Sequence, residues 1–206
     1  MITPLDHTVR GVMEFTWPMI IICTLIISSL RIADIIMNKK EVVFYREILM
    51  LFFMIYILCL FQIVTFEDPL VSSYEDHFNL IPFKEISRYL VGSRLFFKNV
   101  IGNLVMFMPY GFFAAYFTKL DSKYYAFSLI AFASITIETT QLAIGRVFDI
   151  DDIILNIIGG MIGYGIYRLL SKIGNSLPKV FQNKWLLNIL SLVITGILVG
   201  YLWMVI

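Results

Sequence analysis

The residues best suited to chemistry lie between Glu138 and Asn156, in the stretch ETTQLAIGRVFDIDDIILN. A glutamate, a glutamine, an arginine, three aspartates and an asparagine stand here between two apolar runs. Carboxylates and amides exchange hydrogen bonds with sugars or amides, and a guanidinium group binds a phosphate or carboxylate in bidentate fashion. The stretch therefore predicts a polar binding site.

Polar residues recur at helical spacing in this stretch and in an earlier one. Asn99 and Asn103 are four residues apart, and Glu138 and Gln141 are three residues apart, so each pair lies on one helix face.

A third polar face follows in the chain. Asp149, Asp152 and Asn156 are spaced i, i+3 and i+7, which also places them on a single face. Asp151 points off this face and is predicted to be a solvated loop residue.

The predicted ligand-binding residues also include two arginines, Arg94 and Arg146, that could face an anion. The full set is Arg94, Asn99, Asn103, Glu138, Gln141, Arg146, Asp149, Asp152 and Asn156.

Two other interpretations of these residues stay open. Asp149 and Asp152 could hold Mg²⁺ or Ca²⁺, and Glu138 would then be the general base of an enzyme acting on a phosphorylated or pyrophosphorylated lipid. No other cofactor is predicted, and a helix N-cap explains Asp149 or Asp152 equally well. Alternatively, the polar residues only bond the helices to one another.

The elements that must position these residues are membrane-spanning helices. The 206 residues are 59% hydrophobic and 15% charged, whereas a soluble domain has about 45–50% apolar and about 25% charged residues. A net charge of +1 gives no electrostatic case for binding nucleic acid. The composition predicts an all-α, multi-pass membrane protein.

Six apolar runs are suited to crossing a bilayer, which predicts a single-domain bundle of about six spans. They cover residues 15–30, 48–66, 99–118, 124–145, 153–167 and 185–206. A long loop of about residues 67–98 separates the second and third spans. The short loops that would be cytoplasmic with both termini outside hold more Lys and Arg, so the positive-inside rule predicts this orientation.

In that orientation three spans carry a polar side chain near the outer surface. At 1.5 Å per residue, Asn103 and Asn156 lie roughly 6 Å below it and Glu138 roughly 10 Å below it. These side chains are predicted to line a small cavity that opens to the outside, because facing lipid would be costly.

Glycines and prolines shape the spans around this cavity. The spacing of Gly159 and Gly163 predicts close contact with a neighbouring helix, and Pro109 predicts a kink in the third span. After Pro82, apolar and basic residues alternate in a way that predicts an interfacial amphipathic helix, over the cavity or on the outer leaflet.

The sequence resembles the VanZ-like family in three blocks: NLIPF at 79–83, NVIGNLVMFMPYGF at 99–112, and the polar pattern from Glu138 to Gly160. The resemblance covers about residues 79–170. The matching positions are Asn79, Pro82, Asn99, Gly102, Asn103, Phe107, Pro109, Gly111, Glu138, Gln141, Arg146, Asp149, Asp152, Asn156 and Gly159.

This family takes its name from a membrane protein that lowers susceptibility to teicoplanin, a lipid-tailed glycopeptide. The resemblance implies a location in the bacterial cell membrane and a membrane lipid or a lipid-tailed antibiotic as the binding partner. It does not identify a protein partner or a reaction.

Overall fold

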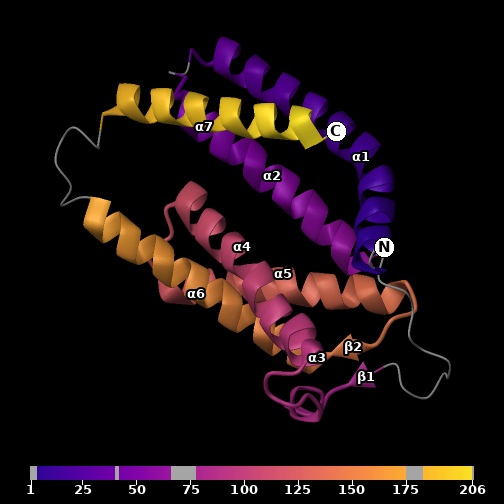
Figure 1. Cartoon of the computed structure of the whole chain (residues 1–206). Coiled ribbons are helices and arrows are strands. Elements are labelled where there is room, and N and C mark those ends of the chain that lie inside the picture. The colour runs from indigo at the N-terminus through magenta and orange to yellow at the C-terminus, as the bar shows by residue number, and fades with distance from the viewer. Residues whose placement is uncertain (1–3, 40–41, 66–77, 175–182, 206) are drawn as a thin grey trace. The chain divides into compact units, whose positions relative to one another are not determined.

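A computed structural model describes residues 4–39, 42–65, 78–174 and 183–205 (Figure 1). The first part of the predicted long loop lies outside the described residues. The long helices are α1 (Pro4–Met37), α2 (Phe44–Thr65), α4 (Gly102–Thr118), α5 (Lys123–Ala143), α6 (Ile150–Gly174) and α7 (Lys184–Val205). The short elements are β1 (Phe78–Asn79), the 3-10 turn η1 (Ile86–Arg88), α3 (Arg94–Phe96), the π-helical turn η2 (Phe97–Ile101) and β2 (Phe148–Asp149).

Four helical segments in the described part of the chain are long and apolar enough to cross a membrane. They are Phe44–Gln62, Arg94–Thr118, Lys123–Ala143 and Ile150–Ile173. The predicted helical membrane class is confirmed at this level. The number of six spans, the orientation of the termini and the kink at Pro109 stay predictions.

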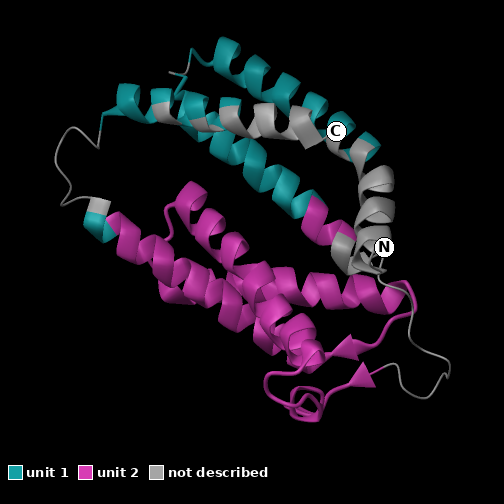
Figure 2. Cartoon of the chain, viewed as in Figure 1, with its two compact units in different colours: residues 1–58, 172–206 teal, residues 59–171 magenta. Residues whose placement is uncertain are grey.

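The chain divides into two compact units (Figure 2). One unit contains residues 1–58 and 172–206, and the other contains residues 59–171. The single domain expected from the sequence stays a prediction.

An ion pair joins helices in the first unit. Arg31 of α1 donates to both carboxylate oxygens of Glu47 in α2, at 2.8 and 2.9 Å, and to Asp34 at 2.8 Å. The Tyr45 amide donates to the Asn188 side chain of α7 at 3.0 Å, which connects α2 to α7. An apolar groove of about 420 Å³ runs between α1 and α2 beside this ion pair.

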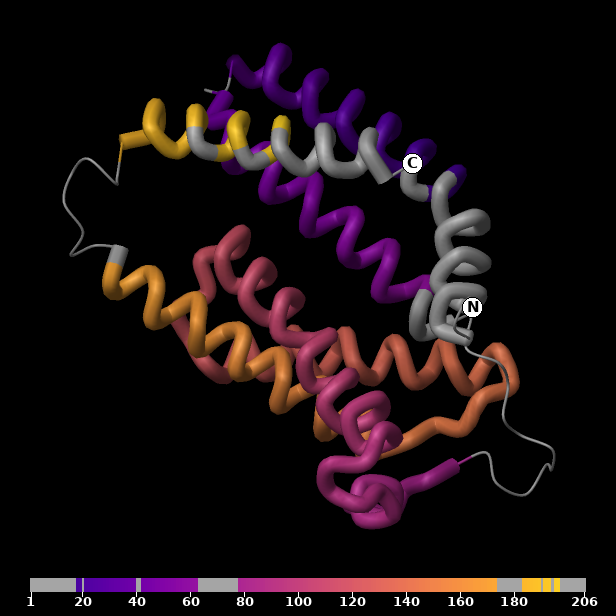
Figure 3. The backbone as a smooth tube through the Cα atoms, in the orientation of Figure 1, coloured from indigo at the N-terminus to yellow at the C-terminus, as the bar shows by residue number. Residues whose placement is uncertain are grey.

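Close packing of α6 against α4 organises the second unit, whose long helices are α4, α5 and α6 (Figure 3). A Cβ atom added to Gly159 would lie 2.0 Å from the Leu104 carbonyl oxygen, and one added to Gly163 would lie 1.9 Å from the Met108 carbonyl oxygen. Backbone thus packs directly on backbone, so the predicted small-xxx-small contact is confirmed.

The end of α4, the start of α5 and the second half of α6 meet in an apolar core. Ala115, Ala126 and Tyr164 are buried there. The Tyr164 hydroxyl donates to the Asp121 carbonyl oxygen at 3.0 Å, which holds α6 to the short connection between α4 and α5.

The predicted amphipathic helix after Pro82 is wrong. Between this residue and α3, the described chain forms only η1 and turns. Phe83 and Gly92 have positive φ angles of 65° and 86°, which interrupt any helix. The apolar pattern was present, but the backbone N–H groups of Phe83, Glu85 and Ile86 bond to the Asp151 side chain.

We expect Gly163→Ala to destabilise the second unit by about 1–3 kcal/mol or more, because the new methyl group would overlap the α4 backbone. Gly165→Ala is the matched control, since nothing lies within 4 Å of its added Cβ atom. Thermal unfolding of the purified protein in detergent measures both. Equal melting temperatures for the two variants would contradict the packing described.

Candidate functional site

The start of α6 is fixed by a short parallel strand pair. β1 pairs with β2 so that Asn79 lies opposite Asp149. The Asn79 amide donates to the Asp149 carboxylate at 2.9 Å, and the Asp151 backbone N–H donates to the same oxygen at 2.8 Å. Asp149 thus caps the N-terminus of α6, which agrees with the N-cap interpretation of this residue.

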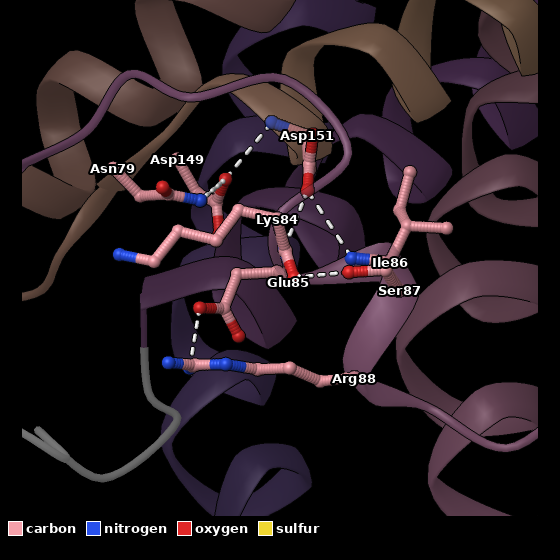
Figure 4. Close-up of polar contacts among 8 residues, drawn as sticks. All are labelled: Asn79, Lys84, Glu85, Ile86, Ser87, Arg88, Asp149 and Asp151. Atoms are coloured by element: carbon pink, nitrogen blue, oxygen red, sulfur yellow. Dashed lines mark hydrogen bonds and ion pairs between the residues drawn. The ribbon is translucent and has the colours of Figure 1, made fainter.

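Asp151 holds the loop that precedes α3. Its side chain accepts hydrogen bonds from the backbone N–H groups of Phe83, Glu85 and Ile86, at 2.5, 2.8 and 3.2 Å. Figure 4 shows the carboxylate directed at the loop, beside the Asn79–Asp149 contact. Asp151 is only 1% exposed, so its prediction as a solvated residue is wrong.

Glu138 of α5 is also 1% exposed and accepts three hydrogen bonds. With its amide oriented so that both ends find partners, Gln141 donates to the two Glu138 carboxylate oxygens at 2.8 and 3.1 Å. The Asp149 backbone N–H donates to Glu138 Oε2 at 3.1 Å. The Gln141 oxygen accepts from Arg146 Nη1 at 3.1 Å, so an arginine is linked to the buried carboxylate through an amide.

The position of Arg146 depends on how α5 ends. Gly145 has φ of 87°, and the Arg146 backbone N–H donates back to the Gln141 carbonyl oxygen at 2.9 Å. This left-handed glycine followed by a return bond closes the helix in the manner of a Schellman motif. The arginine backbone is therefore fixed next to the glutamine that its side chain contacts.

Two further amides complete the arrangement. Asn103 of α4 donates to the Asp152 carboxylate at 2.5 Å. Asn156 of α6 donates to the hydroxyl of Ser134 in α5 at 3.1 Å. These bonds join the three helices of the second unit at one level.

A small space lies between these side chains, with an accessible volume of about 20 Å³. This is enough for one water-sized group. Its apolar walls are Leu60, Met106, Phe107 and Ile137. Its polar lining, called the polar cluster below, is Asn103, Glu138, Gln141, Asp152 and Asn156.

The other four predicted residues lie around the polar cluster rather than in its lining. Arg146 and Asp149 touch it through the bonds described above. Asn99 is hydrogen-bonded to the Tyr89 side chain. Arg94 is exposed at the start of α3.

The sequence prediction missed Tyr89, Ser134 and Asp151. Ser134 precedes Glu138 by four residues and lies on the same helix face, so its spacing could have revealed it. Tyr89 is in an irregular segment where no periodicity guides the choice. Burial raises the pKa of its phenol, and the hydrogen bond with Asn99 partly offsets this rise.

The oxygen atoms predicted to hold a metal have protein partners here. Asp149 accepts from Asn79, and Asp152 accepts from Asn103. Among the described residues, no group of three or more His, Cys, Asp or Glu side chains is arranged to hold a metal ion.

A family model described as VanZ/LLP1 matches residues 48–171. The chain belongs to the VanZ/LLP1 family. The match starts within α2, so the family region of this VanZ/LLP1 protein is longer than the 79–170 expected from the motifs. It includes the whole polar cluster. No curated protein and no solved structure matches the chain.

We expect Asp151→Ala to free the loop, because three backbone N–H groups would lose a charged acceptor, at a cost of about 2 kcal/mol. Trypsin should then cleave faster after the exposed Lys84 and Arg88. Limited proteolysis followed by mass spectrometry measures the rate. Asp121→Ala, which removes a carboxylate that is 89% exposed, is the control. Unchanged cleavage of Asp151→Ala would refute this role.

The burial of Asp149 predicts how the stability of the folded chain depends on pH. Burial raises the pKa of this carboxyl above its ordinary 3.8, more than the bonds from Asp151 and Asn79 lower it, and the nearby charges of Asp151 and Glu85 add to the rise. The folded chain therefore binds this proton more tightly than the unfolded chain. The stabilisation is present at low pH and is lost as pH rises from 3.8 through the raised pKa.

Asp149→Asn cannot titrate and keeps an oxygen for the N-cap. Its unfolding free energy relative to the wild type should therefore increase as pH rises through that window. Thermal unfolding in detergent across acidic pH measures the difference. A difference that is constant with pH would show that Asp149 titrates alike in both states.

Proposed function

We propose that this VanZ/LLP1 protein recognises one polar group of a lipid-linked or lipid-tailed molecule at the polar cluster. Through this recognition it contributes to resistance to teicoplanin-type glycopeptides or to other antimicrobials that act on the cell envelope. With both termini outside, the polar cluster faces the extracytoplasmic side of a bacterial cell membrane. The main support is that Glu138 and Asp152 line the same water-sized space.

The charge balance of this space favours a ligand. Two carboxylates, those of Glu138 and Asp152, face it, and the positive charge of Arg146 attracts both. A carboxylate in a membrane span costs a few kcal/mol, whereas a hydrogen bond between spans returns about 0.6 kcal/mol on average. Neutral amides and hydroxyls could join the helices at lower cost. A hydrogen-bond donor from outside the protein would use the acidic oxygens better.

The size of the space limits what enters it. About 20 Å³ admits a single hydroxyl or ammonium group and excludes a whole headgroup. Sugars and amino sugars carry such groups, and so do many lipid headgroups. The ligand would insert one donor group and keep the rest of its headgroup outside the helices.

Arg146 fits a second group of the same ligand. It is partly exposed, follows the end of α5 and has its backbone fixed by the return bond to Gln141. A guanidinium next to Gln141 would bind a phosphate or carboxylate in bidentate fashion. One ligand that has both an oxyanion and a hydroxyl or ammonium donor would satisfy both parts of the site.

The test uses Glu138→Gln, Asp152→Asn and Arg146→Ala in a bacterial strain without its own copy of the protein. We expect each variant to reach wild-type abundance in the membrane and to lose protection against teicoplanin or cationic peptides. For purified protein, loss of a charged hydrogen bond should weaken ligand binding by about tenfold or more. Membrane abundance and susceptibility are measured for every variant in the same cultures.

Thr139→Ala is the matched control. Thr139 is the neighbour of Glu138, is exposed, and bonds only within its helix, to the Ile135 carbonyl oxygen. It should keep both abundance and protection. If abundance and protection fall together in the three site variants, the cluster only joins helices. If the wild type gives no protection, resistance is not this protein's role.

The same strains distinguish recognition from catalysis. An enzyme acting on a phosphorylated or pyrophosphorylated lipid would alter the lipid pool, and a chelator would stop a metal-dependent reaction. Mass spectrometry of extracted lipids, with and without a chelator, should therefore show no product that depends on Glu138. Detection of such a product would favour the enzyme.

A further inference from the structure

The segment 78–93 of the second unit has an unusual surface for a loop. Its large apolar side chains point outward: Phe78, Leu80, Ile81, Phe83, Leu90 and Val91 are all exposed. Leu90 and Val91 are 82% and 87% exposed, more than the apolar side chains of the neighbouring membrane-spanning helices. Exposing so many apolar side chains to water is unfavourable, and such exposed apolar patches mark an interaction surface.

Hydrogen bonds and a ring contact hold parts of this loop in place. Asp151 accepts hydrogen bonds from the backbone N–H groups of Phe83, Glu85 and Ile86, and Figure 4 shows its carboxylate directed at this part of the loop. Phe78 is further fixed by its ring contact with Phe148, at 6.1 Å between centroids. These contacts fix the part of the apolar surface around Phe78 and Phe83.

The position of the loop in the chain indicates where it lies relative to a bilayer. It leads directly into the membrane-spanning segment that begins at Arg94, and it is bonded to Asp151 in the first turn of the segment that begins at Ile150. Both segments are long and apolar enough to cross a bilayer, and both begin here. Spans that begin here would place the loop at the level of the lipid headgroups.

The opposite ends of these helices provide a comparison. The short connection between α4 and α5 exposes charged residues such as Asp121, while its one leucine, Leu120, packs on the apolar core. Tyr124 and Tyr125 follow and are exposed, as aromatic residues at a membrane interface commonly are. The connection at that end thus exposes polar and aromatic side chains, whereas the loop 78–93 exposes aliphatic ones.

The charges beside the apolar residues favour a lipid with an anionic headgroup. Residues 78–98 contain four basic residues, Lys84, Arg88, Arg94 and Lys98, and one acidic residue, Glu85. Glu85 and Arg88 form an ion pair at 2.5 Å, so the excess positive charge of this segment comes from Lys84, Arg94 and Lys98. Apolar side chains that enter the acyl region together with basic side chains at the headgroups are the pattern of binding to anionic lipid.

We infer that the loop 78–93 is a lipid-binding lip, which inserts Leu90 and Val91 into one leaflet and binds anionic headgroups through its basic residues. The lip is an irregular loop held by a buried aspartate, and it needs no helix. This inference does not rest on the proposed function or on which leaflet is involved.

The test places nitroxide labels on the full chain, reconstituted in vesicles of phosphatidylcholine alone or mixed with phosphatidylglycerol. Cys23 and Cys59 are first replaced by alanine, and single labels are attached through Leu90→Cys, Val91→Cys or the control Asp121→Cys. Collisions with oxygen report lipid around the label, and collisions with a nickel chelate report water.

We expect the labels at positions 90 and 91 to meet oxygen and to be shielded from nickel, more strongly when phosphatidylglycerol is present. The label at position 121 should meet nickel in both vesicles. Lys84→Gln combined with Arg94→Gln should remove the effect of phosphatidylglycerol and leave the insertion seen in phosphatidylcholine.

Three results would overturn the inference. Nickel access at positions 90 and 91 equal to that at 121 would place the loop in water. Shielding from both oxygen and nickel would show that protein covers it, either this chain or a second copy. Insertion that ignores phosphatidylglycerol and the basic residues would remove the anionic lipid as the partner.

Discussion

The close approach of α6 to α4 is the constraint on which the second unit depends. Gly159 and Gly163 allow the two backbones to touch, although a glycine inside a helix costs about 1 kcal/mol relative to alanine. With no side chain between the helices, Asn103 comes within hydrogen-bond distance of Asp152. A wider separation would leave that carboxylate without its donor in apolar surroundings, where an unpaired charge is very costly.

Asp149, Asp151 and Asp152 stand close together at the N-terminus of α6 and repel one another. The chain reduces this repulsion because adjacent helical residues point to different sides. Asp149 caps the helix, Asp151 binds the backbone of the lip, and Asp152 faces α4. Each carboxylate thus has its own donors, and all three lie at the helix N-terminus, where the macrodipole favours negative charge.

Periodicity was enough to predict which helix faces meet. The depth and face of Asn103, Glu138 and Asn156 indicated a common level, and these residues line one space. The glycine spacing likewise identified the α4–α6 contact. Such features are predictable because a regular helix turns sequence spacing into geometry.

The partners of Asp151 could not be found in this way. They are backbone N–H groups more than sixty residues earlier in the chain, and any residue type other than proline offers the same donor. The helix expected after Pro82 failed because side-chain pattern does not reveal the positive φ angles of Phe83 and Gly92, which interrupt it. Tyr89, the partner of Asn99, was missed because it lies in this irregular segment.

The charge balance of the polar cluster depends on a turn rather than on a span. Glu138 is buried inside α5, but the arginine linked to it stands beyond Gly145, where the helix has ended. A guanidinium in this position can remain partly hydrated and still reach Gln141. The protein therefore avoids burying a complete ion pair, which often costs more than its attraction returns. An anionic group that competes for Arg146 would weaken its hold on Gln141 and so change the hydrogen bonding of Glu138.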